Sequence, residues 1–511
     1  MFDDIAWRQV HQYEVSNEYL LQSLENSKKA AQDQRSLSEK RHVSLDATQQ
    51  SVVDAFCASS NSLMLLIGAG GTGKSEVVFR IKENLGDCVL VAATTGKAAA
   101  LIDGATVHCS INIPVKPNHK KALCGAALEK LQCRMSNVTH LIIDEFSMIN
   151  GEFLYWIDQR LQQAKHRNLP FGGLSVLLAG EPAQLAPMGG TPLWAVRAES
   201  ENSSDKETLG KCLYSMFNTV FFLTQNYRQG TANAHDLADF LANYRKGALS
   251  DDNWSWFESR SRERFADQEY DVASEGGVHL YPTNEQVKER NTDKLRQLST
   301  KFGNPVAIFP SKNSCIKAAA ASKKLAGGLD NVVTLCVGAS VMITQNLWTE
   351  EGIVNGATGR IVDFVKDGDE CAVIIVDIPK YRGPPLCGNE PERRKWVPIR
   401  RREATWFTGK KAQTCKREQF PLVLSFAMTI HKSQGSSFAV PIVMDIGKTD
   451  KTCGSTYVAM SRCTESCLIF HSGYARERIM KNFESPAFKC RMREEQRLLA
   501  LHNQRVARNL D

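Results

Sequence analysis

The stretch of sequence that decides the fold is LMLLIGAGGTGKS, residues 63–75. A short apolar run breaks into glycines and ends on a lysine and a serine, which is typical of a buried strand that leads into a phosphate-binding loop. In such a loop the backbone N–H groups from Gly68 to Gly73 surround phosphate oxygens, Lys74 supplies positive charge and the Ser75 hydroxyl reaches Mg²⁺. Residues 76–85 are compatible with a helix, whose N-terminus also favours an anion. The sequence therefore predicts a nucleoside triphosphate site, with a chance glycine-rich turn as the alternative.

The composition is that of an ordinary globular protein with several domains. The chain has 511 residues, 42% of them hydrophobic and 23% charged. This length fits roughly three or four domains. The formal charge of +7 permits a polyanionic partner without identifying one. No apolar run approaches the roughly eighteen residues that cross a bilayer, so we expect no membrane association.

The cysteines and the first residues predict an intracellular address. The fifteen cysteines are scattered without a Cys-x-x-Cys pair, and the closest two are Cys463 and Cys467. Since no secretory signal opens the chain, we expect reduced thiols rather than a disulfide framework or a zinc site. Acidic residues near the start, among them Asp3 and Asp4, do not fit a transit peptide. We therefore expect an intracellular protein, nuclear rather than mitochondrial.

A second apolar run begins at residue 140 and ends in two adjacent carboxylates, Asp144 and Glu145. A strand with this ending, placed after a phosphate loop in an alternating strand and helix chain, is typical of a nucleotide site. Asp144 can hold Mg²⁺, and Glu145 can polarise the attacking water. The alternative is a solvated strand end without a chemical role.

Three further polar side chains lie at informative places in this α/β pattern. The apolar run 174–179 ends shortly before Gln184, and the C-terminal ends of parallel strands are where such sheets bind ligands. Gln184 is therefore a candidate sensor of the γ-phosphate. Gln49 lies in a predicted helix before the phosphate loop, where it either contacts the nucleotide or is simply part of an amphipathic helix. Arg228 follows a strand at 221–223, where a lone arginine is normally a surface residue.

The character of the chain changes between residues 300 and 420. Short valine and isoleucine runs separated by glycines predict a small β-rich insertion. Cations and aromatics alternate in residues 393–406, which fits either a nucleic-acid surface or a solvated charged run. The predicted segments are a polar helical N-terminal extension (1–43), a first lobe (44–225), the two parts of a second lobe (226–299 and 421–475), the insertion (300–420) and a charged helical tail (476–511).

These segments describe two α/β lobes of which only the first carries a phosphate loop, so a single nucleotide would lie between the lobes. Arginines of the opposite lobe can neutralise the transferring phosphoryl group only when the lobes are closed. Nucleotide binding then closes the lobes and hydrolysis reopens them, which can drive movement along a polymer.

Two segments of the second half carry a more specific signal: TIHKSQG, residues 429–435, and YVAMSR, residues 457–462. Together with the phosphate loop, the acid pair and Gly180–Pro187, they resemble the PIF helicases (petite integration frequency type) of helicase superfamily one, group B. The resemblance covers residues from about 45 to 473. It implies an α/β fold of two RecA-like, doubly wound parallel-sheet lobes with a small β-barrel insertion in the second lobe.

The resemblance also assigns roles to individual residues. The residues implied to be catalytic are Lys74, Asp144, Glu145, Gln184, Arg228 and Arg462, the two arginines acting as fingers. Those implied to bind ATP are Gln49, Gly68, Ala69, Gly70, Gly71, Thr72, Gly73, Lys74, Ser75 and Gly435, and those implied to hold Mg²⁺ are Ser75 and Asp144. Those implied to contact DNA are Thr95, Lys97, Thr106, His108, His431 and Lys432. His108 and His431 can instead be structural histidines.

The implied activity is that of an ATP-hydrolysing DNA helicase that moves 5′-to-3′ along single-stranded DNA and unwinds duplexes. The resemblance places it in repair, recombination or the maintenance of telomeres and the genome. The implied partners are single-stranded and forked DNA, with an RNA–DNA hybrid or a G-quadruplex as further candidates, bound by a monomer or a DNA-induced dimer. Most DNA contacts should go to phosphates and depend on salt.

One departure from the family pattern is Glu181, which stands where the family usually has aspartate. The first step that this change would affect is the coupling of hydrolysis to strand movement. An alternative interpretation is a relic of a mobile-element or viral helicase that acts mainly as a DNA-binding protein. A phosphate-loop kinase or transporter ATPase would not need the segments around His431 and Arg462.

Overall fold

The computed structural model describes residues 44–508, except for 115–121, 188, 196–204, 229–234, 350, 369, 388–389, 409–412, 439, 449, 451–452 and 465–467. The predicted N-terminal extension, 1–43, lies outside the described residues. The chain divides into two compact units. The inserted unit contains Thr283–Met428, and the main unit consists of Val43–Pro282 together with Thr429–Asp511.

The main unit contains two parallel sheets, of which the first has six strands in the order β3-β2-β4-β5-β1-β6. This order makes β5 the neighbour of both β1 and β4, so the loops that leave these three strands emerge side by side at one edge of the sheet. The strands are β1 (Leu63–Gly68), β2 (Val89–Ala93), β3 (Ala105–Thr106), β4 (His140–Asp144), β5 (Ser175–Gly180) and β6 (Thr219–Leu223).

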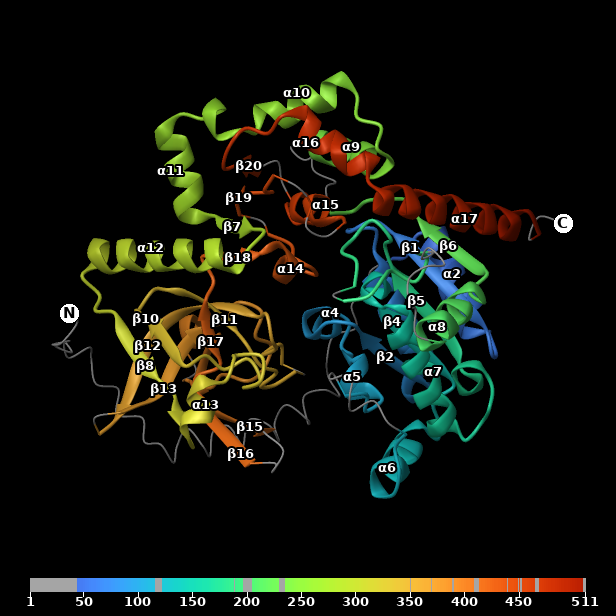
Figure 1. Cartoon of the computed structure of the whole chain (residues 1–511), viewed down its shortest axis with the longest axis horizontal. Coiled ribbons are helices and arrows are strands. Elements are labelled where there is room, and N and C mark those ends of the chain that lie inside the picture. The colour runs from blue at the N-terminus through green and yellow to red at the C-terminus, as the bar shows by residue number, and fades with distance from the viewer. Residues whose placement is uncertain are drawn as a thin grey trace. The chain divides into compact units, whose positions relative to one another are not determined.

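Helices cover both faces of this sheet because successive side chains of a strand point to opposite faces. Leu65 and Ile67 of β1 belong to a core on one face, whereas Met64 and Leu66 belong to a core on the other. Figure 1 shows α7 and α8 side by side over the sheet. The helices of the first face are α5 (Val107–Ser110), α6 (Ala126–Met135), α7 (Gly151–Lys165) and α8 (Asp205–Ser215), and those of the second are α2 (Ala47–Cys57), α3 (Lys74–Leu85) and α4 (Gly96–Leu101).

The second sheet of the main unit contains β7 (Val278–Tyr281), β19 (Ile442–Met444) and β20 (Leu468–Phe470), which run parallel with β19 in the middle. Aromatic packing ties helices to it, because the Phe257 ring stacks on Phe240 and also contacts Phe470 of β20. The two parallel sheets confirm the predicted pair of α/β lobes. The helices of this lobe are α9 (His235–Lys246), α10 (Asp251–Ser259), α11 (Asp267–Gly276), α14 (Ile430–Ser433), α15 (Ser455–Met460) and α16 (Arg476–Glu484).

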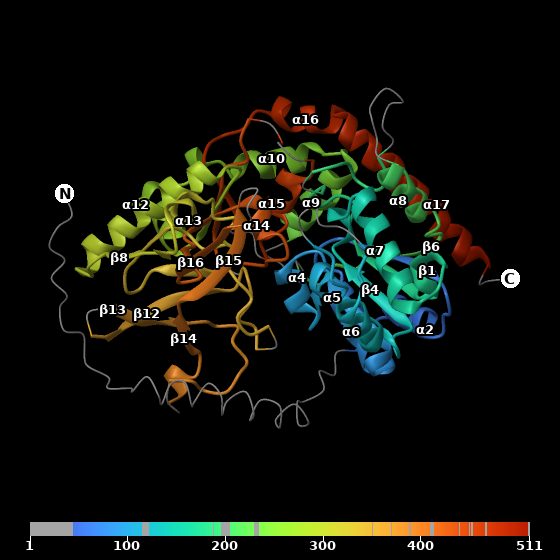
Figure 2. The same cartoon turned by 60° about the horizontal axis from the view of Figure 1, so that its bottom comes forward.

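The C-terminal helix α17 (Pro486–Arg508) leaves the second lobe and packs on the first. Figures 1 and 2 both show it alongside β6. Leu498 is fully buried in the first lobe's core. A ring nitrogen of His502 and the Nε of Arg505 lie 3.0 and 3.1 Å from the carbonyl oxygen of Val220, and the Arg505 guanidinium covers the Phe221 ring. The helix therefore belongs to the core of the first lobe.

The inserted unit is β-rich, as the sequence predicts, but its strands form three antiparallel sheets: β14-β13-β12-β11-β17, β15-β16-β9 and β10-β8. Closing a barrel requires the two edge strands of a sheet to pair. Within the described part of this unit, β14 and β17 pair only with their inner neighbours, so the sheet stays open and the predicted barrel is not confirmed.

After its first helix, the inserted unit consists mostly of strands. They are α12 (Asn284–Phe302), β8 (Ala307–Pro310), β9 (Lys312–Asn313), α13 (Ile316–Ala320), β10 (Val332–Leu335), β11 (Ser340–Ile343), β12 (Thr358–Asp367), β13 (Glu370–Asp377), β14 (Trp396–Arg400), β15 (Arg402–Thr408), β16 (Gln413–Gln419) and β17 (Leu422–Leu424). The chain then passes into the main unit through β18 (Ala427–Thr429). Of the helices in the described ranges, none combines the length and apolar character needed to cross a bilayer.

Replacing Leu498 with alanine tests whether α17 is part of the first lobe's core. We expect Leu498→Ala to lower the free energy of unfolding by about 2–5 kcal/mol, because it leaves a cavity in a close-packed core. The neighbouring Leu499 is 49% exposed, so Leu499→Ala is the matched control and should change stability by less than about 0.5 kcal/mol. Chemical denaturation followed by circular dichroism measures both. Equal losses in the two variants would show that α17 does not dock as described.

Candidate functional site

The phosphate loop predicted from the sequence joins β1 to the first residue of α3. Gly73 has a φ of 83° directly before the helix, and a Cβ at this position would collide with the side-chain amide of Gln49. The Lys74 ammonium donates to the carbonyl oxygens of Gly68 and Ala69 at 2.6 and 3.0 Å. Burial lowers the pKa of Lys74, while nearby carboxylates oppose this shift. The loop thus concentrates positive charge where its backbone N–H groups would surround an anion.

Gln49 lies at the base of this loop and is only 4% exposed. Its backbone N–H and side-chain oxygen form a capping box with Asp46 at the start of α2. Its side-chain nitrogen donates to the carbonyl oxygen of Thr72 at 3.2 Å. From the other side, the backbone N–H of Tyr227 donates to the carbonyl oxygen of Gly71 at 2.8 Å. Gln49 is therefore both a helix-capping residue and a neighbour of the phosphate loop.

Asp144 and Glu145 lie at the C-terminal end of β4, and both are nearly buried, at 8% and 9% exposure. Glu145 has a φ of 58°, and its backbone N–H donates to an Asp144 carboxylate oxygen at 2.9 Å. Burial raises the pKa of Asp144 to about 7, and the charge of Glu145 adds to the effect while Lys74 opposes it. Two carboxylates held this close in a buried place favour a cation beside them.

The residues present fit Mg²⁺, which prefers oxygen ligands and keeps several waters. The candidate protein ligands are the Asp144 carboxylate and the hydroxyl of Ser75, which directly follows Lys74. In the described ranges, no cluster of three or more His, Cys, Asp or Glu side chains could hold a metal by itself. A Mg²⁺ ion at this place would therefore need phosphate and water oxygens to complete its ligands.

Arg228 and Arg462 meet although they are far apart in the sequence. Arg228 donates to the Ser461 carbonyl oxygen at 3.3 Å, and the buried Arg462 donates to the Ser461 hydroxyl at 2.8 Å and to the Ser436 carbonyl oxygen at 3.3 Å. Burial and the charge of Arg462 lower the pKa of Arg228 to about 10. A Cβ on Gly70 would lie 2.9 Å from Arg228 Nη1 and 3.7 Å from Arg462 Nη2. Two mutually repelling cations thus face the phosphate loop, as an anionic ligand requires.

Gln184 occupies the place that the sequence predicts, beside the acid pair. Its side-chain nitrogen donates to Glu181 at 3.3 Å, and its oxygen accepts from Gln434 at 3.4 Å. Gln434 also donates to the Glu145 carboxylate at 3.3 Å. The Gln434 side-chain oxygen is buried without a protein partner in the described part of the chain. A buried acceptor of this kind is suited to a water or a ligand donor at the site.

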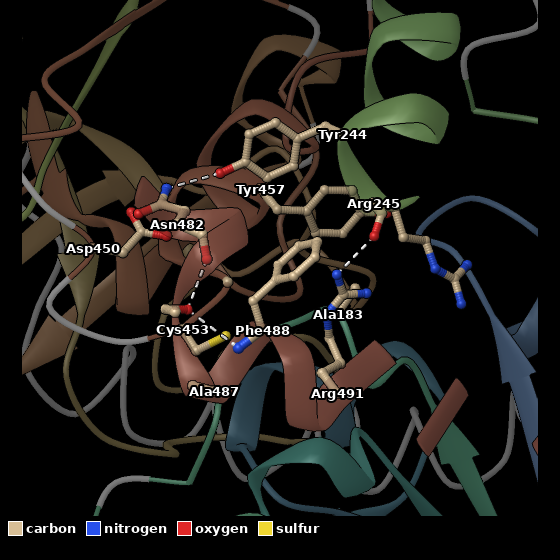
Figure 3. Close-up of a pocket in the computed structure, with 12 residues that line it drawn as sticks. Ala183, Tyr244, Arg245, Asp450, Cys453, Tyr457, Asn482, Ala487, Phe488 and Arg491 are labelled. Atoms are coloured by element: carbon tan, nitrogen blue, oxygen red, sulfur yellow. Dashed lines mark hydrogen bonds between the residues drawn. The ribbon is translucent and has the colours of Figure 1, made fainter. Parts of the chain in front are cut away.

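Sequence reasoning missed three residues of this network. Gln434 lies directly before Gly435 in TIHKSQG, so the signal was present in that segment. The Tyr457 hydroxyl donates to Glu181 at 2.7 Å, and Arg245 forms an ion pair with the same carboxylate at 3.5 Å. Figure 3 shows Tyr457 and Arg245 around a cavity of about 240 Å³. No local pattern around Arg245, in the last turn of α9, could have indicated this contact.

Among the residues predicted to contact DNA, the structure brings those of α4 close to the segment after α14. The Thr95 hydroxyl caps α4 by accepting from the Ala98 backbone N–H at 3.2 Å. Lys97 reaches the Ser436 hydroxyl, which lies one residue after Gly435. The first and second lobes therefore meet at Lys97 and Ser436, in addition to Arg228 and Arg462.

The remaining predicted DNA contacts lie on short helices. Thr106 caps α5 by accepting from the Cys109 backbone N–H at 3.4 Å, and the His108 ring stacks on Phe153 with centroids 4.6 Å apart. On α14, burial lowers the pKa of His431, whereas Lys432 is exposed. The stacking of His108 fits its alternative interpretation as a structural histidine, and all six DNA contacts stay predictions.

Several known proteins have similar sequences. The sequence model of the PIF1-like helicase family matches residues 44–254. The ATP-dependent DNA helicase PIF1 of Xenopus laevis is 28% identical over 455 residues, which cover 88% of this chain and 63% of the frog protein. The ATP-dependent DNA helicase Pif1 of Bdellovibrio bacteriovorus is 27% identical over 427 residues, which cover 82% of this chain and 86% of the bacterial protein. Residues 44–254 thus match the PIF1-like helicase family, and most of this chain is similar in sequence to proteins named ATP-dependent DNA helicase PIF1.

Solved structures of PIF1-like helicases share the fold. The crystal structure of Pif1 from Candida albicans has a TM-score of 0.64 and 23% identity, and the match covers 86% of this chain and 98% of that chain. Bacteroides Pif1 in complex with ADP-AlF3 and single-stranded DNA has a TM-score of 0.62 and 23% identity, and the match covers 86% of this chain and 94% of that chain. The chain spans 63% of the length of the frog relative and 56% of the Homo sapiens one.

The buried hydrogen bond of Tyr457 can be tested by removing a single oxygen. We expect Tyr457→Phe to lower the free energy of unfolding by about 1.5–3 kcal/mol, because the buried Glu181 carboxylate loses a donor. Tyr227→Phe is the matched control, since the Tyr227 hydroxyl donates to Asp46 at an exposed position where water can replace it. The control substitution should lower the free energy of unfolding by less than about 1 kcal/mol. Urea denaturation measures both variants, and a Tyr457→Phe loss no larger than the control's would contradict the network.

Proposed function

We propose that this protein is an ATP-dependent DNA helicase that translocates 5′-to-3′ along single-stranded DNA and unwinds duplexes. The observation that supports it most is the convergence of the phosphate loop and the acid pair with Arg228, Gln434 and Arg462 on one site of the main unit. A phosphoryl-transfer site needs this combination of positioning and positive charge. The domain boundaries and the nuclear address expected from the sequence stay predictions.

Each side chain has a defined part in the proposed hydrolysis of ATP. The phosphate loop and Lys74 would hold the β- and γ-phosphates. Ser75 and Asp144 would hold Mg²⁺, which neutralises phosphate charge when it is bound. Glu145 would orient the attacking water and accept its proton. Arg228 and Arg462 would then stabilise the charge that spreads over the γ-phosphoryl oxygens.

The contacts between the lobes support the proposed coupling of hydrolysis to movement. Gln184 of the first lobe touches Gln434 of the second at 3.4 Å, and Gln434 also touches the Glu145 carboxylate. A change at the γ-phosphate would therefore alter contacts that join the lobes. Lys97 and Ser436 lie at the same junction, next to residues that we propose to contact DNA phosphates.

DNA as the polymer is supported by the relatives, which are named ATP-dependent DNA helicases. A Bacteroides relative was solved with single-stranded DNA, and another structure concerns two coordinating Pif1 helicases at forked DNA. We therefore propose single-stranded and forked DNA as substrates, bound by a monomer or a DNA-induced dimer. An RNA–DNA hybrid or a G-quadruplex stays a further candidate from the resemblance alone.

Strand displacement with ATP and Mg²⁺ tests activity and polarity together. We expect the full-length protein to separate duplexes with a 5′ single-stranded tail and to leave those with a 3′ tail or blunt ends intact. Lys74→Ala should abolish ATP turnover and displacement while DNA binding remains, because the phosphates lose their main countercharge. Lys82→Ala is the control with normal activity, because the Lys82 ammonium, near the other end of the same helix, donates to the carbonyl oxygen of Asp103 and not to the phosphate loop. DNA binding by the unaltered protein without any ATP turnover would instead support a helicase relic.

The role of Arg462 can be separated from nucleotide binding. We expect Arg462→Ala to slow DNA-stimulated ATP hydrolysis by about a thousandfold while ATP affinity changes little, because the charge acts on the transition state. Arg462→Lys should recover only part of the rate, since it keeps the charge but lacks the planar fork. Arg476→Ala, at a half-exposed surface ion pair with Glu258, is the control. Lost ATP affinity with an unchanged rate would refute the finger role.

A further inference from the structure

Two thiols of the inserted unit lie almost in contact although they are 100 residues apart in the sequence. The sulfur atoms of Cys315 and Cys415 are 3.7 Å apart. Both side chains pack against one small apolar cluster that contains Ala318, Leu329 and Trp406. A disulfide needs the sulfurs at about 2.05 Å, so they have to approach by less than about 2 Å.

The backbone fixes this proximity. Strand β9 pairs with β16, and just beyond the last pair the backbone N–H of Ser314 donates to the carbonyl oxygen of Lys416 at 3.0 Å. The backbone N–H of Lys416 in turn donates to the Ser314 hydroxyl oxygen at 2.9 Å. These two bonds place Cys315, which follows Ser314, opposite Cys415, which precedes Lys416. Cys315 and Cys415 therefore face each other as a consequence of strand register.

A buried cation holds the segment after Cys315 in place. Arg417, two residues after Cys415, is 1% exposed, and its guanidinium donates to the carbonyl oxygens of Ala318, Ala321 and Leu329 at 2.6, 2.9 and 3.0 Å. Side chains at i and i+2 of a strand share one face. The Arg417 side chain therefore lies on the same face of β16 as Cys415.

The Cys315 thiol is more accessible than the Cys415 thiol and has a lowered pKa, as the reactive thiol of a redox-sensing pair requires. Cys315 is half-buried at the start of α13, and a hydrogen bond from the Ala318 backbone lowers its pKa. Cys415 is fully buried beside it. By contrast, burial raises the pKa of Cys371, in the same unit, to about 11. Oxidation selects accessible thiols with thiolate character that lie next to a second cysteine.

We propose that Cys315 and Cys415 form a reversible disulfide and make the inserted unit sensitive to hydroperoxides. The Cys315 thiolate attacks the peroxide, the O–O bond breaks, and the released hydroxide takes up a proton to leave as water. The Cys315 sulfenic acid then reacts with Cys415: an S–S bond forms, the S–O bond breaks, and the departing hydroxide leaves as water with the Cys415 proton. Two thiols and one hydrogen peroxide thus give one disulfide and two waters, and the two electrons pass from sulfur to oxygen.

The bond would tie the start of α13 to β16 covalently, where at present Arg417 and backbone hydrogen bonds hold the segment. Inside cells, disulfides are usually transient and redox-sensing rather than structural. The pair thus agrees with the expectation of reduced thiols under resting conditions, and it adds a site that responds when oxidant rises.

Mass spectrometry of the full-length protein tests the pair. The reduced protein is treated with hydrogen peroxide, quenched by alkylation and digested without reductant. We expect a peptide that links Cys315 to Cys415, its loss on addition of dithiothreitol, and oxidation of Cys315 at least about tenfold faster than that of Cys371. In Cys415→Ser the Cys315 sulfenic acid should persist and be trapped by dimedone, whereas in Cys315→Ser the buried Cys415 should stay reduced.

Cys371→Ser is the matched control and should form the linked peptide at the normal rate. Circular dichroism checks that each variant is folded, and the linked peptide from the unaltered protein keeps the test decisive even if one variant is not. Absence of that peptide, or oxidation of Cys315 no faster than that of Cys371, would overturn the proposal. A link from Cys315 to any other cysteine would do the same.

Discussion

Buried charge is the constraint on which the main unit depends. Lys74, Asp144, Arg228 and Arg462 all have pKa values shifted toward their neutral forms, and burial is the first cause each time. Burying an unpaired charge costs several kcal/mol per ion, which is on the order of the net free energy of unfolding of a whole domain. The cations and carboxylates of this site partly offset one another's charge, but burial still disfavours the charged form of each of these four groups. The proposed triphosphate with Mg²⁺ would stabilise these charged forms, because it would bring negative charge to the cations and positive charge to the carboxylates.

Strand order explains how the charges meet. Since β5 lies between β1 and β4, the phosphate loop, the acid pair and the Glu181 segment all leave the same edge of one sheet. The second lobe contributes through α14 and α15, and α17 connects it back to the first. Glu494 of α17 accepts from Tyr214 of the first lobe at 2.7 Å, and the next residue, Glu495, pairs with Arg245 of the second. This helix therefore limits how far the lobes can separate.

Local patterns in the sequence indicated the segments that the structure brings together at the candidate site, whereas several contacts between these segments depend on long-range packing. The phosphate loop and the acid pair are each encoded within a few consecutive residues, so they could be identified without a structure. The contact of Arg245 with Glu181 and the meeting of Cys315 with Cys415 depend on packing between distant segments, for which no local signal exists. The predicted barrel stays unconfirmed for the same reason: glycine-separated valine runs indicate strands but not which edges pair.

Glu181 shows how the structure accommodates the departure from the family pattern. Its carboxylate is fully buried and is contacted by Gln184, Tyr457 and Arg245, so the longer side chain is not left without partners. Gln184 belongs to the first lobe, whereas the other two partners belong to the second. Tyr457 lies in α15, and Arg462 follows two residues after the end of this helix. The buried Glu181 carboxylate therefore contacts side chains of both lobes, so the longer side chain is accommodated by hydrogen bonds and an ion pair that join them.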